Sequence, residues 1–352
     1  MSQSTHARGD QEARDLLEAL VRIPSVTPDE QAAAQRLVEF FEEHDRDVWI
    51  DEVGNVRAPA DDGVLLTSHI DTVPGDIPVR VEANDDDNAE LWGRGSVDAK
   101  GPLCSMAIAA VRTGASFIGV VGEEVDSRGS RYVIEDRESE PDAVINGEPS
   151  GWEGITLGYR GLLAGTYVAT SESGHSSRPD NNAIQNALDW WSAVEAEFET
   201  GEWQPVFERV TCKPVSIDGG VSEDGLSVET TMAVQLRVPP AYTTDEIREI
   251  ADGHLTDGTV HWDDRVEPVM ESPRTAVART FRAAIRQADG EPHLLRKTGT
   301  SDMNVFAQAW DCPMVTYGPG DSDLDHAPDE HIVLEEYDRS VAILEDVTER
   351  LL

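Results

Sequence analysis

Seven carboxylate and imidazole side chains in this sequence stand at turns that follow apolar segments or glycines. They are His69, Asp71, Asp98, Glu123, Glu124, Glu148 and His326. Histidine and carboxylate groups without cysteine suit zinc, cobalt or manganese better than calcium or magnesium. Buried carboxylates without a partner are costly, and a bound cation would satisfy them. The residue types therefore predict a metal centre.

The size of this set favours two metal ions. Asp98 lies in a glycine-rich turn, LWGRGSVDAKGP, and we expect its carboxylate to bridge both ions. One ion would take His69, Asp98 and Glu148, and the other would take Asp98, Glu124 and His326. A shared carboxylate holds two ions about 3.5–4 Å apart, which is the spacing used in two-metal hydrolysis. His331 is an alternative to His326, which we prefer because His331 directly precedes an apolar helical segment.

Two acidic residues remain once the ligands are assigned. Glu123 is adjacent to Glu124, and neighbouring residues in a turn do not easily coordinate the same site. We therefore expect Glu123 to hold the attacking water and take its proton as general base. Asp71 lies two residues beyond His69 and is available to orient that imidazole.

Short apolar segments precede most of the candidate ligands. The segments are 63–70, 116–121 and 143–146, and a helical pattern separates the first two. Alternating strands and helices predict an α/β catalytic domain with a mostly parallel central sheet. In open sheets of this kind, sites form beyond the carboxyl ends of the strands. We therefore expect the candidate ligands to meet at one edge of the sheet.

The pattern changes near Tyr159. Strands are expected at 162–170, 210–217 and 227–238, and helices at 183–198 and 244–255. This pattern is typical of an α+β sandwich, and segment 158–264 is long enough to form a small domain. The core pattern returns from Pro273. We therefore expect 158–264 to be inserted into a discontinuous catalytic domain made of 1–157 and 265–352.

Acidic residues far outnumber basic ones, 69 against 28, so that the formal net charge is −41. Such an excess argues against nucleic acid or an anionic membrane as the main partner. The acids are dispersed between apolar runs, which favours adaptation to high salt, where the Debye length falls to about 3 Å. The first residues carry no apolar signal region, and no apolar run approaches the ~20 residues of a membrane span. We expect a soluble, cytoplasmic protein.

Five motifs together resemble a known family. They are His69-x-Asp71, Gly95-Ser96-Val97-Asp98-x-Lys100-Gly101, Glu123-Glu124, Gly147-Glu148-Pro149 and Asp325-His326-x-Pro328-x-Glu330. Their order along nearly the whole chain resembles the zinc aminoacylase and carboxypeptidase family, which includes acetylornithine deacetylase and succinyl-diaminopimelate desuccinylase. The resemblance implies the same two-metal assignment, with zinc as the first candidate. It also implies a cis peptide bond after Asp98 and a homodimer formed through the inserted domain.

The same resemblance extends to the inserted domain. The segment Ser-Gly-His-Ser-Ser-Arg-Pro at 173–179 resembles the family's Gly-His-Ser motif. A histidine there, His175, can polarise the scissile carbonyl and stabilise the oxyanion. Arg178 is then a candidate to bind a substrate carboxylate as a bidentate fork, and Arg160 is a second candidate anion contact.

The loop Lys-Thr-Gly-Thr-Ser-Asp at 297–302 is rich in hydrogen-bond donors. It most resembles the branch of the family that releases lysine or ornithine from a small amino-group carrier protein. Thr300, Ser301 and Asp302 are the candidate substrate contacts in this loop. Asp302 would meet the amine of a basic side chain.

The resemblance predicts a two-metal amidohydrolase that frees ornithine or lysine from the carrier protein, late in arginine or lysine biosynthesis. Deacylation of a small N-acyl amino acid, of the acetylornithine or succinyl-diaminopimelate type, is the first alternative. A dipeptidase is the second. A metal-binding protein without catalysis would be marked by the loss of Glu123, and this chain has Glu123.

Overall fold

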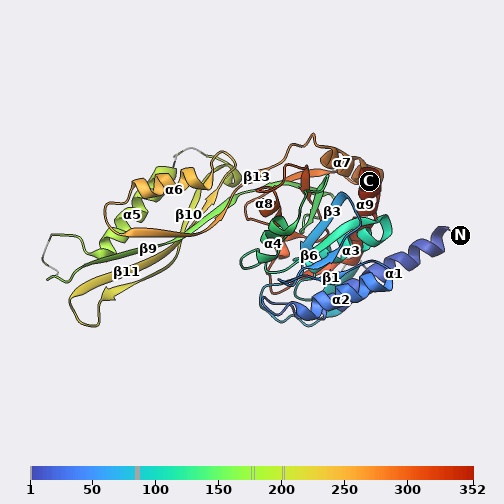
Figure 1. The fold of residues 1–352 in the computed structure, drawn as a ribbon, viewed down its shortest axis with the longest axis horizontal. Helices are drawn as coiled ribbons and strands as arrows, with labels where there is room; N and C mark the ends of the chain where they lie inside the picture. Colours follow the sequence, from blue (N-terminus) through green and yellow to red (C-terminus); the bar gives the residue numbers. More distant parts are fainter. Residues whose placement is uncertain (1, 84–87, 176, 178, 200, 202) are drawn as a thin grey trace. The chain divides into compact units, whose positions relative to one another are not determined.

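The computed structural model describes residues 2–83, 88–175, 177, 179–199, 201 and 203–352. The chain divides into two compact units (Figure 1). The larger unit comprises Met1–Leu157, Glu271–Leu295 and Ser301–Leu352, and the inserted unit comprises Gly158–Met270 and Arg296–Thr300. The second junction thus follows Met270, whereas the sequence pattern places it after Asp264. Residues 296–300 group with the inserted unit.

A central sheet forms the framework of the larger unit. Its strand order in the described residues is β1-β2-β6-β3-β7-β15-β8-β13, with β14 beside β8. The strands are β1 (Trp49–Ile50), β2 (Val56–Ala58), β3 (Asp61–His69), β6 (Ala115–Val120), β7 (Val144–Gly147), β8 (Gly154–Tyr159), β13 (Val269–Met270), β14 (His293–Lys297) and β15 (Met314–Thr316). Strands β6, β3, β7 and β15 pair in parallel. The α/β class with a mostly parallel central sheet is therefore confirmed.

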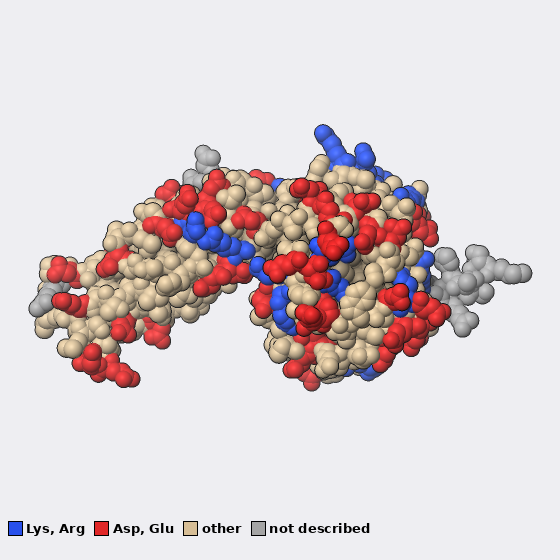
Figure 2. All heavy atoms as spheres, viewed as in Figure 1, with Lys and Arg blue, Asp and Glu red and all other residues tan. Residues whose placement is uncertain are grey.

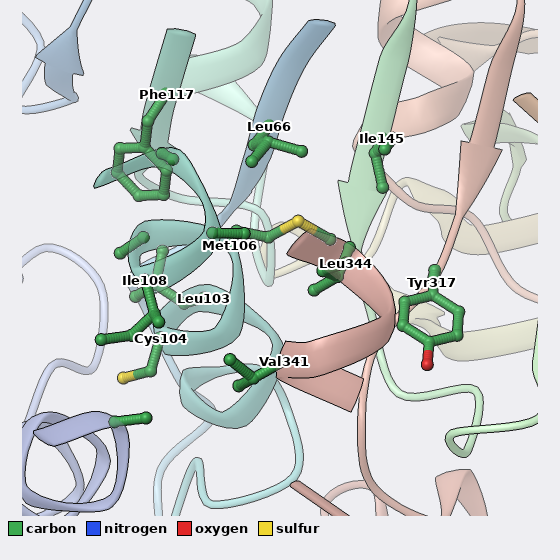
Figure 3. Packing of buried hydrophobic residues seen from close by; sticks show 14 of the residues in the cluster. Leu66, Leu103, Cys104, Met106, Ile108, Phe117, Ile145, Tyr317, Val341 and Leu344 are labelled. Atoms are coloured by element: carbon green, nitrogen blue, oxygen red, sulfur yellow. The ribbon is translucent and has the colours of Figure 1, made fainter. Parts of the chain in front are cut away.

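Helices α3 (Lys100–Thr113) and α9 (Leu334–Leu351) pack against each other and against β3. Helix α3 is buried along almost its whole length because its sequence, KGPLCSMAIAAVRT, is mostly apolar or small. In Figure 3, side chains from these helices and the sheet, among them Leu66, Met106 and Leu344, fill the layer between them. The remaining helices of this unit are α1 (Ser2–Val21), α2 (Gln31–Glu43), α4 (Arg128–Asp136), α7 (Ala276–Gln287), α8 (Asp302–Phe306) and the 3₁₀ turn η2 (Ser322–Leu324).

A small second sheet flanks two loops of the larger unit. Its order is β16 (His331–Val333), β5 (Ala89–Trp92) and β4 (Arg80–Ala83). Strand β5 leads into the loop that carries Asp98, and β16 follows the loop that carries His326. Because β5 and β16 pair in antiparallel register, with Leu91 opposite Ile332, the start of the Asp98 loop lies beside the end of the His326 loop.

The inserted unit is a four-stranded antiparallel sheet packed against two helices. Its strand order is β10-β11-β9-β12. The elements are β9 (Gly161–Glu172), α5 (Ala183–Phe198), the 3₁₀ turn η1 (Val206–Glu208), β10 (Thr211–Val221), β11 (Ser227–Val238), α6 (Thr244–Gly253) and β12 (Thr259–Val266). Both helices begin with a capping box, at Asn182 and Thr243. Trp190 of α5 stacks on Tyr167 of β9, with ring centroids 5.1 Å apart. The unit has the predicted α+β architecture.

Acidic side chains are scattered over the visible surface of each unit (Figure 2). On this face the negative charge is therefore scattered and not confined to one segment. No helix in the described part of the chain combines the length and apolarity that a membrane crossing needs.

Candidate metal centre

Parallel strands of the larger unit end where the candidate ligands begin. Strand β3 ends at His69, and β7 ends directly before Glu148. Strand β6 lies beside β3 and ends shortly before Glu124. Because these strands are parallel, their carboxyl ends meet at one edge of the sheet. Asp98 reaches this edge from the loop between β5 and α3, and His326 reaches it from the loop after β15.

Asp98 is the shared member of two groups of possible ligands. In the first group, His69 Nε2 lies 3.0 Å from Asp98 Oδ1 and 3.9 Å from Glu148 Oε2. In the second group, His326 Nε2 lies 3.1 Å from both Asp98 Oδ2 and Glu124 Oε1. Within each group, one donor atom from every member lies within 4.8 Å of the others. The two oxygens of Asp98 thus face different imidazoles, as in a carboxylate shared by two cations.

The His69 ring is oriented by Asp71. Its Nδ1 lies 3.0 Å from the backbone carbonyl oxygen of Asp71 and 3.6 Å from Asp71 Oδ1. A carbonyl oxygen only accepts, so this contact puts a proton on Nδ1 and turns Nε2 toward Asp98. Metal-binding histidines in proteins are commonly held in this way. The peptide bond that follows Asp98 is cis, as the family resemblance implies.

Glu123 lies beside both groups. None of the described residues donates a hydrogen bond to its carboxylate, and burial together with the nearby Glu148 raises its pKa well above the ordinary value. One oxygen of this carboxylate also lies within 4.8 Å of donor atoms of His69 and Glu124, which makes a third group of possible ligands. Distance therefore allows Glu123 to act either as a base beside the centre or as a ligand.

The donor set fits divalent cations. Burial raises the pKa of Glu148 well above its ordinary value, with a further contribution from Asp98. Burial also raises the pKa of Asp98, but its hydrogen bonds with His326 and His69 outweigh that effect and hold the pKa below its usual range. Hydrogen bonds with Asp98 and Glu124 raise the pKa of His326 to about 10. Burying several carboxylates close together costs free energy unless bound cations neutralise their charge.

His331, the alternative to His326, belongs to none of the ligand groups found among the described residues. Its ring stacks on Trp92, with centroids 4.4 Å apart and planes at 18°. Its Nδ1 lies 2.7 Å from the backbone oxygen of Asp329. The ring therefore packs on the small sheet, away from the shared carboxylate.

His175 belongs to the inserted unit. The backbone amide of Ser177 donates to His175 Nδ1 at 3.3 Å, and the Ser177 hydroxyl lies 2.8 Å from the same atom. Because an amide can only donate, Nδ1 is the acceptor and the proton of the neutral ring is on Nε2. The exposed ring thus offers a hydrogen-bond donor, as the polarisation of a carbonyl requires. Arg178 lies outside the described residues.

Arg160 is buried in the inserted unit, with its guanidinium engaged by the protein itself. It donates to the Thr298 carbonyl at 2.9 Å and to Thr211 Oγ1 at 2.9 Å. Burial lowers its pKa to about 10, and Arg237 adds to the effect. Arg237 in turn donates to Thr300 Oγ1 at 3.4 Å. These contacts make Arg160 and Arg237 supports of the segment Arg296–Thr300.

Ser301 and Asp302 begin helix α8 in the larger unit. The Ser301 hydroxyl accepts from the Met303 amide at 3.3 Å, and the Ser301 amide donates to Asn304 Oδ1 at 2.9 Å. Ser301 is thus the N-cap of the helix, a role that uses its hydroxyl locally. Asp302 is 1% exposed, and burial raises its pKa to about 6.

Two supporting residues have no role at the metal centre in the sequence analysis, where only their types and positions are visible. Thr27 Oγ1 donates to Asp71 Oδ2 at 3.0 Å. Glu330 accepts hydrogen bonds from the loop that carries Asp98. The position of Glu330 inside the His326 motif is a signal that could have pointed to a function, whereas Thr27 has no comparable signal.

Comparison with known proteins is consistent with this geometry. Residues 65–350 match the family described as peptidase family M20/M25/M40. A protein of Deinococcus radiodurans named "[LysW]-lysine hydrolase" is 40% identical, over 97% of this chain and 98% of its own length. A protein of Thermococcus kodakarensis named "Putative [LysW]-lysine/[LysW]-ornithine hydrolase" is 36% identical, over 97% and 92%.

The fold also resembles solved structures. An M20 family metallo-carboxypeptidase from Sulfolobus solfataricus superposes with a TM-score of 0.78 at 18% identity, over 97% of this chain and 99% of that one. The family match, which spans most of the sequence, agrees with the resemblance seen in the motifs. This chain belongs to peptidase family M20/M25/M40.

Proposed function

We propose that this protein is a two-metal amidohydrolase that releases lysine or ornithine from an amino-group carrier protein. The observation that carries the proposal is the shared carboxylate of Asp98 between two groups of possible ligands. The substrate follows from relatives at 40% and 36% identity whose names specify lysine or ornithine bound to LysW. Both relatives align with almost the whole chain, so each alignment includes the inserted unit as well as the candidate metal ligands. The reaction belongs late in lysine or arginine biosynthesis, in the cytoplasm.

Two divalent cations, zinc first and cobalt or manganese as alternatives, suit the donors. The residues that would hold them are His69, Asp98, Glu124, Glu148 and His326. Nitrogen and oxygen donors without sulfur favour these metals. Such cations supply Lewis acidity, which polarises an amide carbonyl and makes water more acidic.

The surrounding residues divide the proton chemistry. Glu123 takes a proton from the attacking water and returns it to the leaving amine, since its raised pKa suits a group that must gain and lose a proton. Asp71 holds the His69 ring with Nε2 toward Asp98. His175, whose Nε2 carries the proton, donates to the developing oxyanion.

The substrate carries carboxylate and amine groups that the chain can bind. Arg178 pairs with a carboxylate, while Asp302 attracts the amine of the lysine or ornithine side chain. Arg160 acts indirectly, because its guanidinium supports the segment that contains Thr300. Ser301 acts through the start of helix α8, which sets the position of Asp302.

Assembly as a homodimer through the inserted unit is part of the proposal. Strand β10 is an edge strand of the antiparallel sheet, and its outer residues are exposed, including Val215, Ile217 and Val221. Exposed apolar edge strands are suited to pair with a second copy. The charge of −41 supports high salt as the working condition and disfavours nucleic acid or a membrane as partner.

The substrate assignment is tested by direct competition between compounds. The metal-loaded protein is incubated at high salt with carrier-linked lysine, carrier-linked ornithine and acetylornithine, and the free amino acid is measured by chromatography. We expect release from the carrier-linked compounds and none from chelator-treated protein. Release from acetylornithine alone would instead identify a deacylase of small molecules.

A further inference from the structure

We infer that Glu330 is a positioning residue that joins the loop carrying Asp98 to the loop carrying His326 and so sets the geometry of the shared centre. The inference rests on the two-metal site of the proposed function. Glu330 is 0% exposed and lies near the end of the His326 loop, just before β16. It is not a member of any ligand group among the described residues, so its role must be exerted through other residues.

The Glu330 carboxylate contacts the Asp98 loop through both of its oxygens. Oε1 accepts from the backbone amides of Val97, at 2.9 Å, and Asp98, at 3.1 Å. Oε2 accepts from Arg94 Nη1 at 2.7 Å. The carboxylate therefore binds three donors from one loop, and one of them is the amide of the bridging residue itself.

The backbone adds a second connection between the same two loops. The amide of Gly93 donates to the Glu330 carbonyl at 3.3 Å. One residue further out on each side, Trp92 of β5 pairs with His331 of β16. The two loops are thus joined at their bases by the small sheet and above it by the Glu330 side chain.

This arrangement controls where Asp98 points. The two Asp98 oxygens lie 3.0 and 3.1 Å from the imidazoles of different ligand groups, so a small rotation of the residue would disturb both groups at once. The Asp98 amide donates to Glu330, which lies four residues after His326. A movement of either loop would therefore also move the other. Partners that orient metal ligands typically change metal affinity or activity 10–100-fold when they are lost.

The test replaces one oxygen of this carboxylate. In Glu330→Gln, the side chain keeps its shape, but an NH₂ group replaces one acceptor, so either Arg94 or the loop amides lose their partner. The control is Glu90→Gln, which changes a mostly buried acid of the small sheet beside Glu330; its carboxylate is 3.8 Å from His331 Nε2. Cation affinity is measured by calorimetry and coordination by the absorption spectrum of the cobalt-loaded protein.

We expect the Glu330→Gln protein to fold and to bind cations about 10–100-fold more weakly than the parent. Its cobalt spectrum should change, and kcat should fall more than KM rises. The Glu90→Gln protein should match the parent in all three readouts. Equal affinity and an unchanged spectrum in Glu330→Gln, or the same loss in Glu90→Gln, would overturn the inference.

A second variant keeps the test decisive if Glu330→Gln does not fold. Arg94→Gln removes only the Oε2 partner and leaves both backbone contacts, so we expect a smaller loss of affinity and a smaller spectral change. An unchanged Arg94→Gln centre would then reject the inference. The parent protein distinguishes the proposed function from the role of Glu330. If the parent binds no cation pair, the proposed function fails. If the parent and the variants bind cations equally well, only the role of Glu330 is refuted.

Discussion

The Asp71 carboxylate accepts a hydrogen bond from the backbone amide of Glu123, with 3.1 Å between Asp71 Oδ1 and the nitrogen. Its other oxygen accepts from the amide of Glu124, also at 3.1 Å. The same carboxylate lies 3.6 Å from the His69 ring. One buried acid thus holds an imidazole, the proposed base and a proposed ligand in a fixed relation.

Asp71→Asn should lower kcat while leaving the fold intact. The amide side chain has one acceptor oxygen, so one of the two backbone amides or the His69 contact loses its partner. We expect a 10–100-fold fall in turnover, measured by steady-state kinetics. Asp51→Asn is the control, because the Asp51 side chain is only 7% exposed and accepts from backbone amides, at Gly54 and Asn55, outside the centre. A similar loss in both variants would show a general effect on stability.

Glu123→Gln separates the base from the ligands. If Glu123 only moves protons, the variant should retain the parent's metal content while turnover falls by about 10²–10⁴-fold. Metal content is measured by elemental analysis after gel filtration. Loss of a cation would make Glu123 a ligand, as the third group with His69 and Glu124 permits. Retained activity would remove it from the mechanism.

Cation binding should release protons and strengthen as the pH rises. In the metal-free protein, hydrogen bonds to Asp98 and Glu124 raise the pKa of His326 to about 10, so its ring is charged at neutral pH. Burial likewise raises the pKa of Glu148. A cation must displace these protons, and it therefore competes better at high pH. Calorimetry in buffers of different ionisation enthalpy measures the release, and identical heats in all buffers would contradict it.

Gly95→Ala should destabilise the larger unit more than Gly114→Ala. Both glycines have left-handed backbones, with φ of 81° and 84°, which costs about 1–2 kcal/mol for alanine. At Gly95 the added Cβ would also lie 2.6 Å from Thr72 Cγ2, whereas at Gly114 nothing lies within 4 Å. We expect about 1–3 kcal/mol more loss at Gly95, measured by denaturant unfolding. An equal loss of unfolding free energy in both variants would mean that the loop around Gly95 makes room for the added Cβ without cost.

The meeting of the candidate ligands at one edge of the sheet could be predicted because it depends on short-range patterns. His69 ends an apolar strand, Glu124 and Glu148 follow shortly after others, and parallel strands bring such positions together. The support given by Arg160 could not be predicted, because its acceptors at Thr298 and Thr211 are remote in sequence.

The second junction was misplaced for a related reason. The acidic pair Asp263 and Asp264 is typical of a loop, yet it lies within β12, which pairs with β9 as far as Val266. A register shift between Trp262 and Asp264 accommodates the polar residues at this irregularity. The sequence pattern predicts no strand over 259–266 and therefore ends the inserted domain where the hydrogen-bonded ladder continues.

The insertion also sets the order in which the centre can be completed during translation. His69, Asp98 and Glu148 leave the ribosome before the inserted unit, but His326 follows Glu124 by 202 residues. A nascent chain can therefore present one group of candidate ligands long before His326 completes the other. Translation that stops within the inserted unit would yield a product without His326, so the proposed centre would be complete only when synthesis continues past residue 326.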